Sequence, residues 1–192
     1  MDYLNRHADV RKDPQKLLEG VRAIICVGRV LPRDDADVPD DHGRIARYAQ
    51  FADYHKTLKK TLHRLADTLR TRWGDAQFRC CVDTAPLFER EYAQRAGLGW
   101  QGKHTLTLNR DLGSHMMLGE ILTTLALPPD TAETDHCGTC MRCIDACPTD
   151  CISPYSVDAS RCISYFTIEH RGPIAPAYHP AIGSWIFGCD IC

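Results

Sequence analysis

The sequence has no long apolar run. No stretch approaches the roughly 18 uninterrupted apolar residues that a membrane-spanning helix requires. The N-terminal sequence, which starts Met1-Asp2-Tyr3, also lacks the charged segment followed by an apolar segment that is typical of a signal peptide. These absences predict a cytoplasmic protein without a membrane partner. The formal net charge of -2 excludes a general attraction to nucleic acid, so a local patch would have to hold any such partner.

Cysteine is scarce in the first part of the chain and frequent in the last. Of the eleven cysteines, only Cys26, Cys80 and Cys81 precede position 137. The later ones have metal-type spacings, which favours metal binding over a disulfide scaffold. The early three fall in apparent strands and are interpreted as small buried apolar residues.

The length of 192 residues, with 44% hydrophobic and 25% charged residues, fits one soluble domain and a small second module. Hydrophobic periodicity predicts helices at 14–19, 45–72 and 86–96 and strands at 22–30, 78–82 and 105–109. The apolar run 116–127 fits either a strand or a helix. An acidic loop at 31–43 is interpreted as a surface excursion or a lid.

The alternation of helices and strands predicts an α/β (α+β) domain over residues 1–130. The composition then shifts to cysteine, proline and glycine, which indicates a second module over 131–192. In the predicted long helix, basic side chains recur between Tyr54 and Arg72. They are interpreted either as an ordinary solvated helix face or as a nucleic-acid patch.

The strongest motif is the run C-x2-C-x2-C-x3-C-P, formed by Cys137, Cys140, Cys143, Cys147 and Pro148. In such runs the first three thiolates hold one [4Fe-4S] cluster and the fourth reaches a neighbouring cluster. A zinc site would explain Cys137 and Cys140 but not the whole run with its proline. The run therefore predicts a ferredoxin-like 2[4Fe-4S] module that transfers single electrons.

The remaining cysteines give an uneven ligand count. One cluster receives a full set from Cys147, Cys162, Cys189 and Cys192. The other receives only Cys137, Cys140 and Cys143. A second ferredoxin-type run would supply the missing ligand just beyond Cys192, and Cys151 is the alternative within the chain.

Further motifs along nearly the whole chain resemble those of epoxyqueuosine reductases. They are Met1-Asp2-Tyr3-Leu4-Asn5-Arg6-His7, Arg47-Tyr48-Ala49, Asp53-Tyr54-His55-Lys56, Val82-Asp83-Thr84-Ala85-Pro86-Leu87, Glu89-Arg90, Ala96-Gly97-Leu98-Gly99-Trp100, Gly102-Lys103-His104, Gly113-Ser114, Leu118-Gly119-Glu120-Ile121, Arg161-Cys162-Ile163-Ser164-Tyr165, Thr167-Ile168-Glu169 and Gly188-Cys189-Asp190 with Cys192.

The resemblance implies a cobalamin-binding catalytic domain at 1–130 and two [4Fe-4S] clusters, one lacking its fourth cysteine in this chain. It implies reduction of epoxyqueuosine at the anticodon wobble position of tRNA to queuosine, the last step of queuosine synthesis. The expected protein is a cytoplasmic monomer that receives electrons from an unidentified reductant. Family members begin about fifty residues earlier and continue past Cys192, so both domains are expected to be incomplete.

The resemblance also implies residue roles. It makes Asp83 the proton donor, and the position of Asp83 after an apolar strand is consistent with that role. The alternative from the sequence alone is that Asp83 or Thr84 caps the following helix. The residues that the resemblance places at cobalamin are Arg6, Tyr54, His55, Asp83, Thr107, Leu118, Ser164 and Tyr165. Aromatic and arginine side chains expected to contact the RNA loop are Trp100, Tyr165, Arg171 and Trp185.

Two other functions remain open on the sequence. A corrinoid-dependent reductase of a small molecule, similar to reductive dehalogenases, would share both cofactors without affinity for tRNA. A ferredoxin-type electron carrier would contain iron and sulfide without cobalamin. The roughly 130 residues ahead of the cysteine run count against the carrier, because a carrier needs no domain of that size.

Overall fold

The computed structural model describes residues 7–32, 39 and 42–192. Arg6 and most of the acidic 31–43 loop lie outside the described residues. The chain forms two compact units. Unit 1 comprises Met1–Val30, Asp53–Trp100 and Thr107–Thr134, and unit 2 comprises Leu31–Ala52, Gln101–Leu106 and Asp135–Cys192. The change at 134/135 lies close to the predicted linker, while two earlier stretches also group with the C-terminal unit.

A three-stranded sheet organises unit 1, with strand order β1-β6-β3. Its strands are β1 (Ala23–Val30), β3 (Phe78–Cys81) and β6 (Met116–Thr123). Both strand predictions at 22–30 and 78–82 are confirmed, and the first eight residues of the ambiguous run 116–127 form the strand β6. Because β6 lies between β1 and β3 and runs antiparallel to both, the unit is an α+β arrangement rather than a parallel α/β layer.

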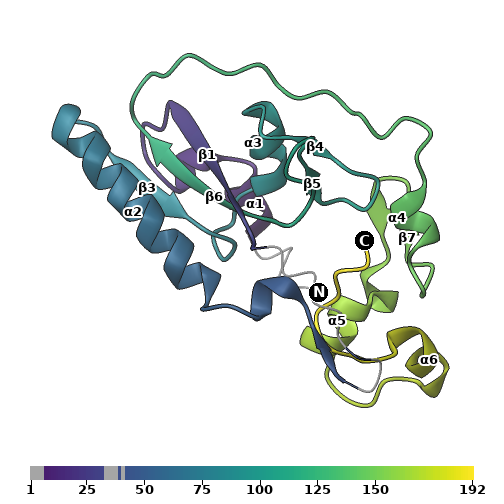
Figure 1. The fold of residues 1–192 in the computed structure, drawn as a ribbon. Helices are drawn as coiled ribbons and strands as arrows, with labels where there is room; N and C mark the ends of the chain where they lie inside the picture. Colours follow the sequence, from purple (N-terminus) through teal and green to yellow (C-terminus); the bar gives the residue numbers. More distant parts are fainter. Residues whose placement is uncertain (1–6, 33–38, 40–41) are drawn as a thin grey trace. The chain divides into compact units, whose positions relative to one another are not determined.

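Helices cover both faces of this sheet, as Figure 1 shows for α2 (Tyr54–Arg72) and α3 (Glu89–Arg95). Leu58, Leu62 and Ala66 recur every four residues on α2 and are buried against Val82 and Ile121. The opposite face carries α3. The short helix α1 (Ala8–Arg11) and the 3-10 helix η2 (Pro14–Lys16) precede β1 in the chain. Leu17, Leu87 and Leu122 form the core there.

Gly119 in β6 allows the close approach of α2. A Cβ atom at this position would lie 2.9 Å from Leu62 Cδ1 and 3.2 Å from Leu58 Cδ2. Any side chain would therefore push the helix away from the sheet.

The predicted helix 45–72 is wrong at its N-terminal end, because α2 begins at Tyr54. The Asp53 carboxylate accepts a hydrogen bond from the His55 N–H at 2.9 Å and caps the helix. The preceding residues form the strand β2 (Arg44–Ile45) and the 3-10 helix η3 (Arg47–Ala49) instead. Elsewhere the predicted helix at 14–19 shortens to η2.

The strand predicted at 105–109 shortens to β5 (Thr107–Leu108), preceded by β4 (Trp100–Gln101). The predicted helix at 86–96 is confirmed as α3 with slightly shorter bounds.

Unit 2 consists of short elements around the cysteines. They are α4 (Arg142–Asp145), β7 (Ile152–Ser153), β8 (Ser156–Val157), η4 (Ala159–Arg161), α5 (Ile163–Ile168), η5 (Pro176–Tyr178), α6 (His179–Ile182) and β9 (Trp185–Phe187). Ile163, Phe166 and Ile182 form its core. The fold is short of regular structure, as expected for a module held together by metal clusters.

Strand β9 pairs in parallel with β2, which explains why residues 44–52 belong to unit 2. The Ala46 N–H donates to the Phe187 carbonyl at 2.8 Å. Gly188 then follows with φ of +69°, and a Cβ atom there would lie 2.4 Å from Ala46 Cβ. Only glycine allows this approach. Among the described residues, no helix is long and apolar enough to cross a membrane.

The packing of α2 on the sheet predicts unequal costs for two leucines on the same helix. Leu62 is 0% exposed and Leu65 is 38% exposed. We expect Leu62→Ala to lower the free energy of unfolding by about 2–5 kcal/mol, because it leaves a cavity. Leu65→Ala is the matched control and should cost less than about 1 kcal/mol. Urea unfolding followed by circular dichroism measures both, and equal costs would contradict the packing described.

Candidate functional site

Asp83 lies in a tight turn just after β3. Its φ is +47°, in the left-handed region that non-glycine residues seldom adopt. The Thr84 N–H donates to the Val82 carbonyl at 2.5 Å, so Asp83 is the central residue of the turn. Strained backbone of this kind is found preferentially at functional sites. The turn projects the Asp83 side chain from the sheet edge, with 54% of it exposed.

The Asp83 carboxylate is held by two residues at the start of α2. The Tyr54 hydroxyl donates to Asp83 Oδ2 at 2.9 Å, and His55 Nε2 lies 2.9 Å from the same oxygen. The other ring nitrogen of His55, Nδ1, lies 2.9 Å from Asp53 Oδ1. The Tyr54 and His55 rings stack with centroids 4.1 Å apart. Asp53, His55 and Asp83 thus form a carboxylate–imidazole–carboxylate chain.

This chain raises the pKa of His55. Partial desolvation lowers the pKa, but the hydrogen bonds and negative charges of Asp83 and Asp53 outweigh that effect. Conversely, the hydrogen bond from His55 lowers the pKa of Asp53. His55 is therefore biased toward the protonated form that donates to both carboxylates.

The capping interpretation of Asp83 is wrong. Helix α3 begins at Glu89, its N-cap residue is Phe88, and no side chain caps it. Asp83 lies six residues before the helix and bonds to α2 instead. The proton-donor interpretation stays a prediction, although the described residues leave the carboxyl half exposed rather than desolvated.

Two glutamates lie behind the Asp83 turn, and the sequence reasoning assigned them no role. Glu89 Oε1 accepts the Asp83 N–H at 2.5 Å. Glu120 is 0% exposed in the middle of β6, opposite Cys26 on β1 and Cys81 on β3. In the sequence, the one sign of a role for Glu120 was its place in the middle of an apolar run, and the structure turns its side chain away from α2. A charged residue at a buried strand position is rare without a partner or a function.

The remaining predicted cofactor residues of unit 1 lie on β5 and β6. Thr107 is buried, and its hydroxyl has no hydrogen-bond partner in the described part of the chain. Leu118 is half-buried on β6 opposite Gly28. A buried hydroxyl without a partner is unusual, and a bound group with polar substituents would satisfy it. Arg6 lies outside the described residues.

Ser164 and Tyr165 belong to unit 2, on α5, and both are half-buried. The Tyr165 ring packs against Phe166 and His170. Of the side chains predicted to contact RNA, Trp185 packs against the unit 2 core, Arg171 is exposed and Trp100 is half-buried in unit 1. Their roles stay predictions.

The cysteines assigned to one full cluster set lie near one another in unit 2. After burial, the Cys162 and Cys147 thiolates are among the causes that raise the pKa of Cys189 to about 11. Burial and the thiolates of Cys189, Cys162 and Cys147 likewise raise the pKa of Cys192 to about 11. Four thiolates this close together repel one another. A cationic cluster core bound between them would offset that repulsion and stabilise the thiolate form.

A single-ion site is a different matter. Within the described ranges, no group of three or more histidine, cysteine or carboxylate residues converges closely enough to hold one metal ion. The ligands of a four-iron cube bind at its separate corners, so they stand further apart than the ligands of one ion.

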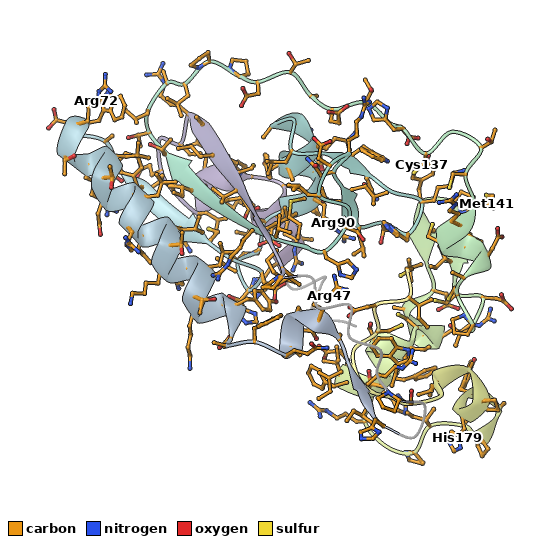
Figure 2. The ribbon with its side chains drawn as sticks, in the orientation of Figure 1. Arg47, Arg72, Arg90, Cys137, Met141 and His179 are labelled. Atoms are coloured by element: carbon orange, nitrogen blue, oxygen red, sulfur yellow. The ribbon has the colours of Figure 1, made fainter. Side chains whose placement is uncertain are left out.

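The turn that carries Cys137, Cys140 and Cys143 is anchored by Lys103, a residue to which the sequence reasoning gave no role. Lys103 is 8% exposed, and its ammonium donates to the carbonyls of Gly138 and Cys140 at 2.8 Å each. Figure 2 labels Cys137 and Met141 on the segment that leads into α4. The buried ammonium therefore fixes the backbone of this segment.

Cys151 lies beside the Cys147 set. Its sulfur is 3.4 Å from Cys147 Sγ. Burial, the hydrogen bond with Cys147 and the Cys147 and Cys162 thiolates raise its pKa to about 12, against a lowering by Thr149. The alternative that Cys151 completes the Cys137, Cys140 and Cys143 set gains no support from this placement.

Comparisons with known proteins agree with the two parts of the chain. Residues 11–84 match the family model "Epoxyqueuosine reductase QueG, DUF1730", and residues 136–192 match the "4Fe-4S double cluster binding domain". The protein is thus of the iron–sulfur class, with a QueG-type domain ahead of a double-cluster module.

Individual relatives narrow this class. The whole chain is 46% identical to an epoxyqueuosine reductase of Xanthomonas campestris and spans 56% of that relative's length. The chain belongs to the epoxyqueuosine reductase family. It spans about half to three fifths of the length of such relatives.

Two solved structures share the fold. An epoxyqueuosine reductase with an epoxyqueuosine-modified tRNA-Tyr stem loop matches with a TM-score of 0.85 and 32% identity, over 93% of this chain and 49% of that one. The enzyme of Bacillus subtilis, with its catalytic aspartate loop swung out of the active site, matches with a TM-score of 0.87 and 30% identity. That match covers 96% of this chain and 50% of the other.

The Asp53–His55–Asp83 chain predicts an elevated titration of one histidine. Because the folded-state pKa of His55 is raised, its stabilising contribution is present below the ordinary value of 6.5 and is lost as the pH rises through the raised pKa. We expect the His55 ring signals to titrate above 6.5 in NMR spectra and to move down in Asp83→Asn. Asp75→Asn, at an exposed position, should leave them in place. A His55 pKa unaffected by Asp83→Asn would contradict the geometry.

The clustering of four cysteines predicts the outcome of a thiol substitution. We expect Cys162→Ser to lower the iron content of the anaerobically isolated protein by about four atoms per chain, because a cluster loses a corner ligand. Cys80→Ala, in β3 of unit 1, is the matched control and should leave iron unchanged. Metal analysis decides, and equal iron in both variants would show that Cys162 holds no cluster.

Proposed function

We propose that this chain carries the catalytic and electron-transfer parts of an epoxyqueuosine reductase. The reaction is reduction of the epoxide of epoxyqueuosine, at the wobble position of tRNA, to the alkene of queuosine. Cobalamin and [4Fe-4S] clusters are the cofactors of the proposal, with an unidentified reductant as the electron source. The proposed protein acts in the cytoplasm as a monomer.

The observation that carries this proposal is the Asp83 carboxyl, fixed at a strained turn by two α2 side chains in the same chain as a double-cluster module. A plain electron carrier has no use for such an acid. The family relationship and the structure of a relative with a modified tRNA stem loop support the same substrate. A small-molecule corrinoid reductase has no comparable support.

The proposed chemistry needs a proton at a defined place. Removing the epoxide oxygen as water takes two electrons and two protons, so an acid must reach that oxygen. Both Tyr54 and His55 contact Asp83 Oδ2, while Oδ1 has no hydrogen bond within the described residues. Asp83 Oδ1 is therefore the oxygen that would take up a proton and pass it to the substrate in our proposal. After the transfer, Tyr54 and His55 stabilise the carboxylate that remains.

One observation in unit 1 supports the binding of cobalamin. The buried Thr107 hydroxyl lacks a partner among the described residues, and the amide substituents of a corrin are hydrogen-bonding groups that would satisfy it. Thr107, Leu118 and Tyr54 are the proposed contacts to the ring in unit 1. When bound, cobalamin supplies a strongly reducing cobalt centre for the electron transfer to the epoxide.

The cysteines of unit 2 would hold the clusters that relay electrons from the reductant in this proposal. Cys147, Cys162, Cys189 and Cys192 hold one cluster, and Cys137, Cys140 and Cys143 contribute three ligands to the other. Lys103 fixes the second of these sets through its two carbonyl contacts. Electrons would pass one at a time, as is usual for such clusters.

The proton-donor role predicts a selective loss of activity. We expect Asp83→Asn to slow the single-turnover conversion of epoxyqueuosine to queuosine in tRNA by about 10²- to 10⁴-fold. Cobalt content, iron content and tRNA affinity should stay unchanged, because the amide preserves the size of the side chain. Mass spectrometry of the digested tRNA measures the conversion.

Asp75→Asn is the control for this test, since Asp75 is exposed on another loop. A rate for Asp83→Asn within about threefold of the parent would rule out Asp83 as the acid, because a general acid contributes far more than that.

A further inference from the structure

The Asp83 turn has a second anchor besides Tyr54 and His55, and it acts on the backbone instead of the carboxyl. Glu89 is the first residue of α3, and its side chain reaches back to accept the Asp83 N–H at 2.5 Å. Tyr54 and His55 fix where the carboxyl points. Glu89 fixes the peptide from which the side chain departs.

This backbone contact answers a specific need of the turn. At φ of +47° the Asp83 N–H points out of the turn, and the Thr84 N–H and hydroxyl already occupy the Val82 carbonyl. The turn itself offers no acceptor to the Asp83 N–H. Without Glu89, the Asp83 N–H would have no acceptor, and nothing else in the turn would favour the positive φ of Asp83, which L residues seldom adopt.

Glu89 is itself seated on a buried carboxyl. Glu120 is 0% exposed, and neither of its oxygens has a hydrogen-bond partner among the described residues. Burial and the nearby Glu89 charge raise the pKa of Glu120 to about 9. Glu120 is thus neutral at physiological pH, and the pair carries at most one negative charge, which resides on Glu89.

The surroundings of the pair favour this distribution of charge. Desolvation raises the pKa of Glu89 to about 7, while the Asp83 N–H, the neighbouring Glu120 carboxyl and Arg90 lower it and the Asp83 charge raises it. From the neighbouring strands Cys26 and Cys81 face Glu120, and both thiols are neutral because burial raises their pKa to about 12 and about 11. Among these neighbours only Arg90 attracts the Glu89 charge.

We propose that Glu89 is the positioning residue that latches the Asp83 turn in its working conformation, with the buried Glu120 beneath it as its support. In the Bacillus subtilis relative the catalytic aspartate loop is swung out of the active site. In this chain the released turn is the one that has lost the bond from the Asp83 N–H to Glu89.

The inference rests on the proposed function for its catalytic consequence, but the latch can be measured without activity. Hydrogen exchange of a peptide covering residues 82–88 reports the opening of the turn in the full chain, reconstituted with iron, sulfide and cobalamin. We expect Glu89→Leu, which removes the acceptor, to speed this exchange at least tenfold. Glu91→Leu on the exposed side of the same helix is the control and should leave it unchanged.

Two further measurements distinguish a hydrogen bond from Glu89 to the turn from simple packing of the Glu89 side chain: the Glu89→Gln variant and the pH dependence of protection. Glu89→Gln keeps an oxygen that accepts the Asp83 N–H, so it should retain most of the protection. In the parent chain, protection corrected for the intrinsic exchange rate should fall to about the Glu89→Gln level as the pH drops through about 7, because protonation turns a charged acceptor into a neutral one. In Glu89→Gln this pH dependence should disappear. If Glu89→Leu does not fold, these two measurements still decide.

Exchange that is equal in Glu89→Leu and Glu91→Leu, or a pH dependence that persists in Glu89→Gln, would overturn the latch. Single-turnover conversion of modified tRNA adds the catalytic test, in which Glu89→Leu should lose about 10²-fold and Glu89→Gln much less. A parent chain without conversion, but with the expected exchange pattern, would refute the proposed function and leave the latch standing.

Discussion

The hydrogen bonds between the start of α2 and the Asp83 turn determine the arrangement of the candidate site. They require α2 to begin at Tyr54, and the Asp53 cap sets that start. They also require the turn after β3 to hold a positive φ at Asp83. The close packing of Leu58 and Leu62 over Gly119 then brings the first turn of α2 to the end of β3. In unit 1, the packing of α2 on the sheet therefore also sets the geometry of the candidate site.

The same sheet explains the buried acid behind the site. Because β6 lies between β1 and β3, its residues that face away from α2 are covered on both sides. Glu120 occupies such a position, where a leucine would give a more stable core. Keeping an acid there makes sense when it sets the charge of Glu89, which contacts the turn. Stability is exchanged for control of a functional loop, as is common at active sites.

Much of this arrangement was predictable from the sequence, and the failures have physical causes. Apolar runs predicted β1 and β3 because strand burial follows directly from residue type. The helix predicted from residue 45 failed because residues 44–46 form tertiary hydrogen bonds with β9, which no local pattern reveals. Antiparallel order likewise depends on long-range pairing. The cysteine grouping was predictable, since cluster ligation restricts spacing.

The functional residues divide in the same way. Asp83, Tyr54 and His55 were identified through resemblance, and their mutual contacts follow from the fold. Glu89, Glu120 and Lys103 were missed because acidic and basic residues are common on surfaces, and only three-dimensional burial makes these three unusual.

The most direct test of the account is anaerobic reconstitution of the chain with iron, sulfide and cobalamin, followed by optical spectra and analysis of cobalt and iron. The account predicts one cobalt per chain together with at least one four-iron cluster. Iron without cobalt would contradict it, because the Asp83 site would then lack the reducing centre on which the proposed reaction depends.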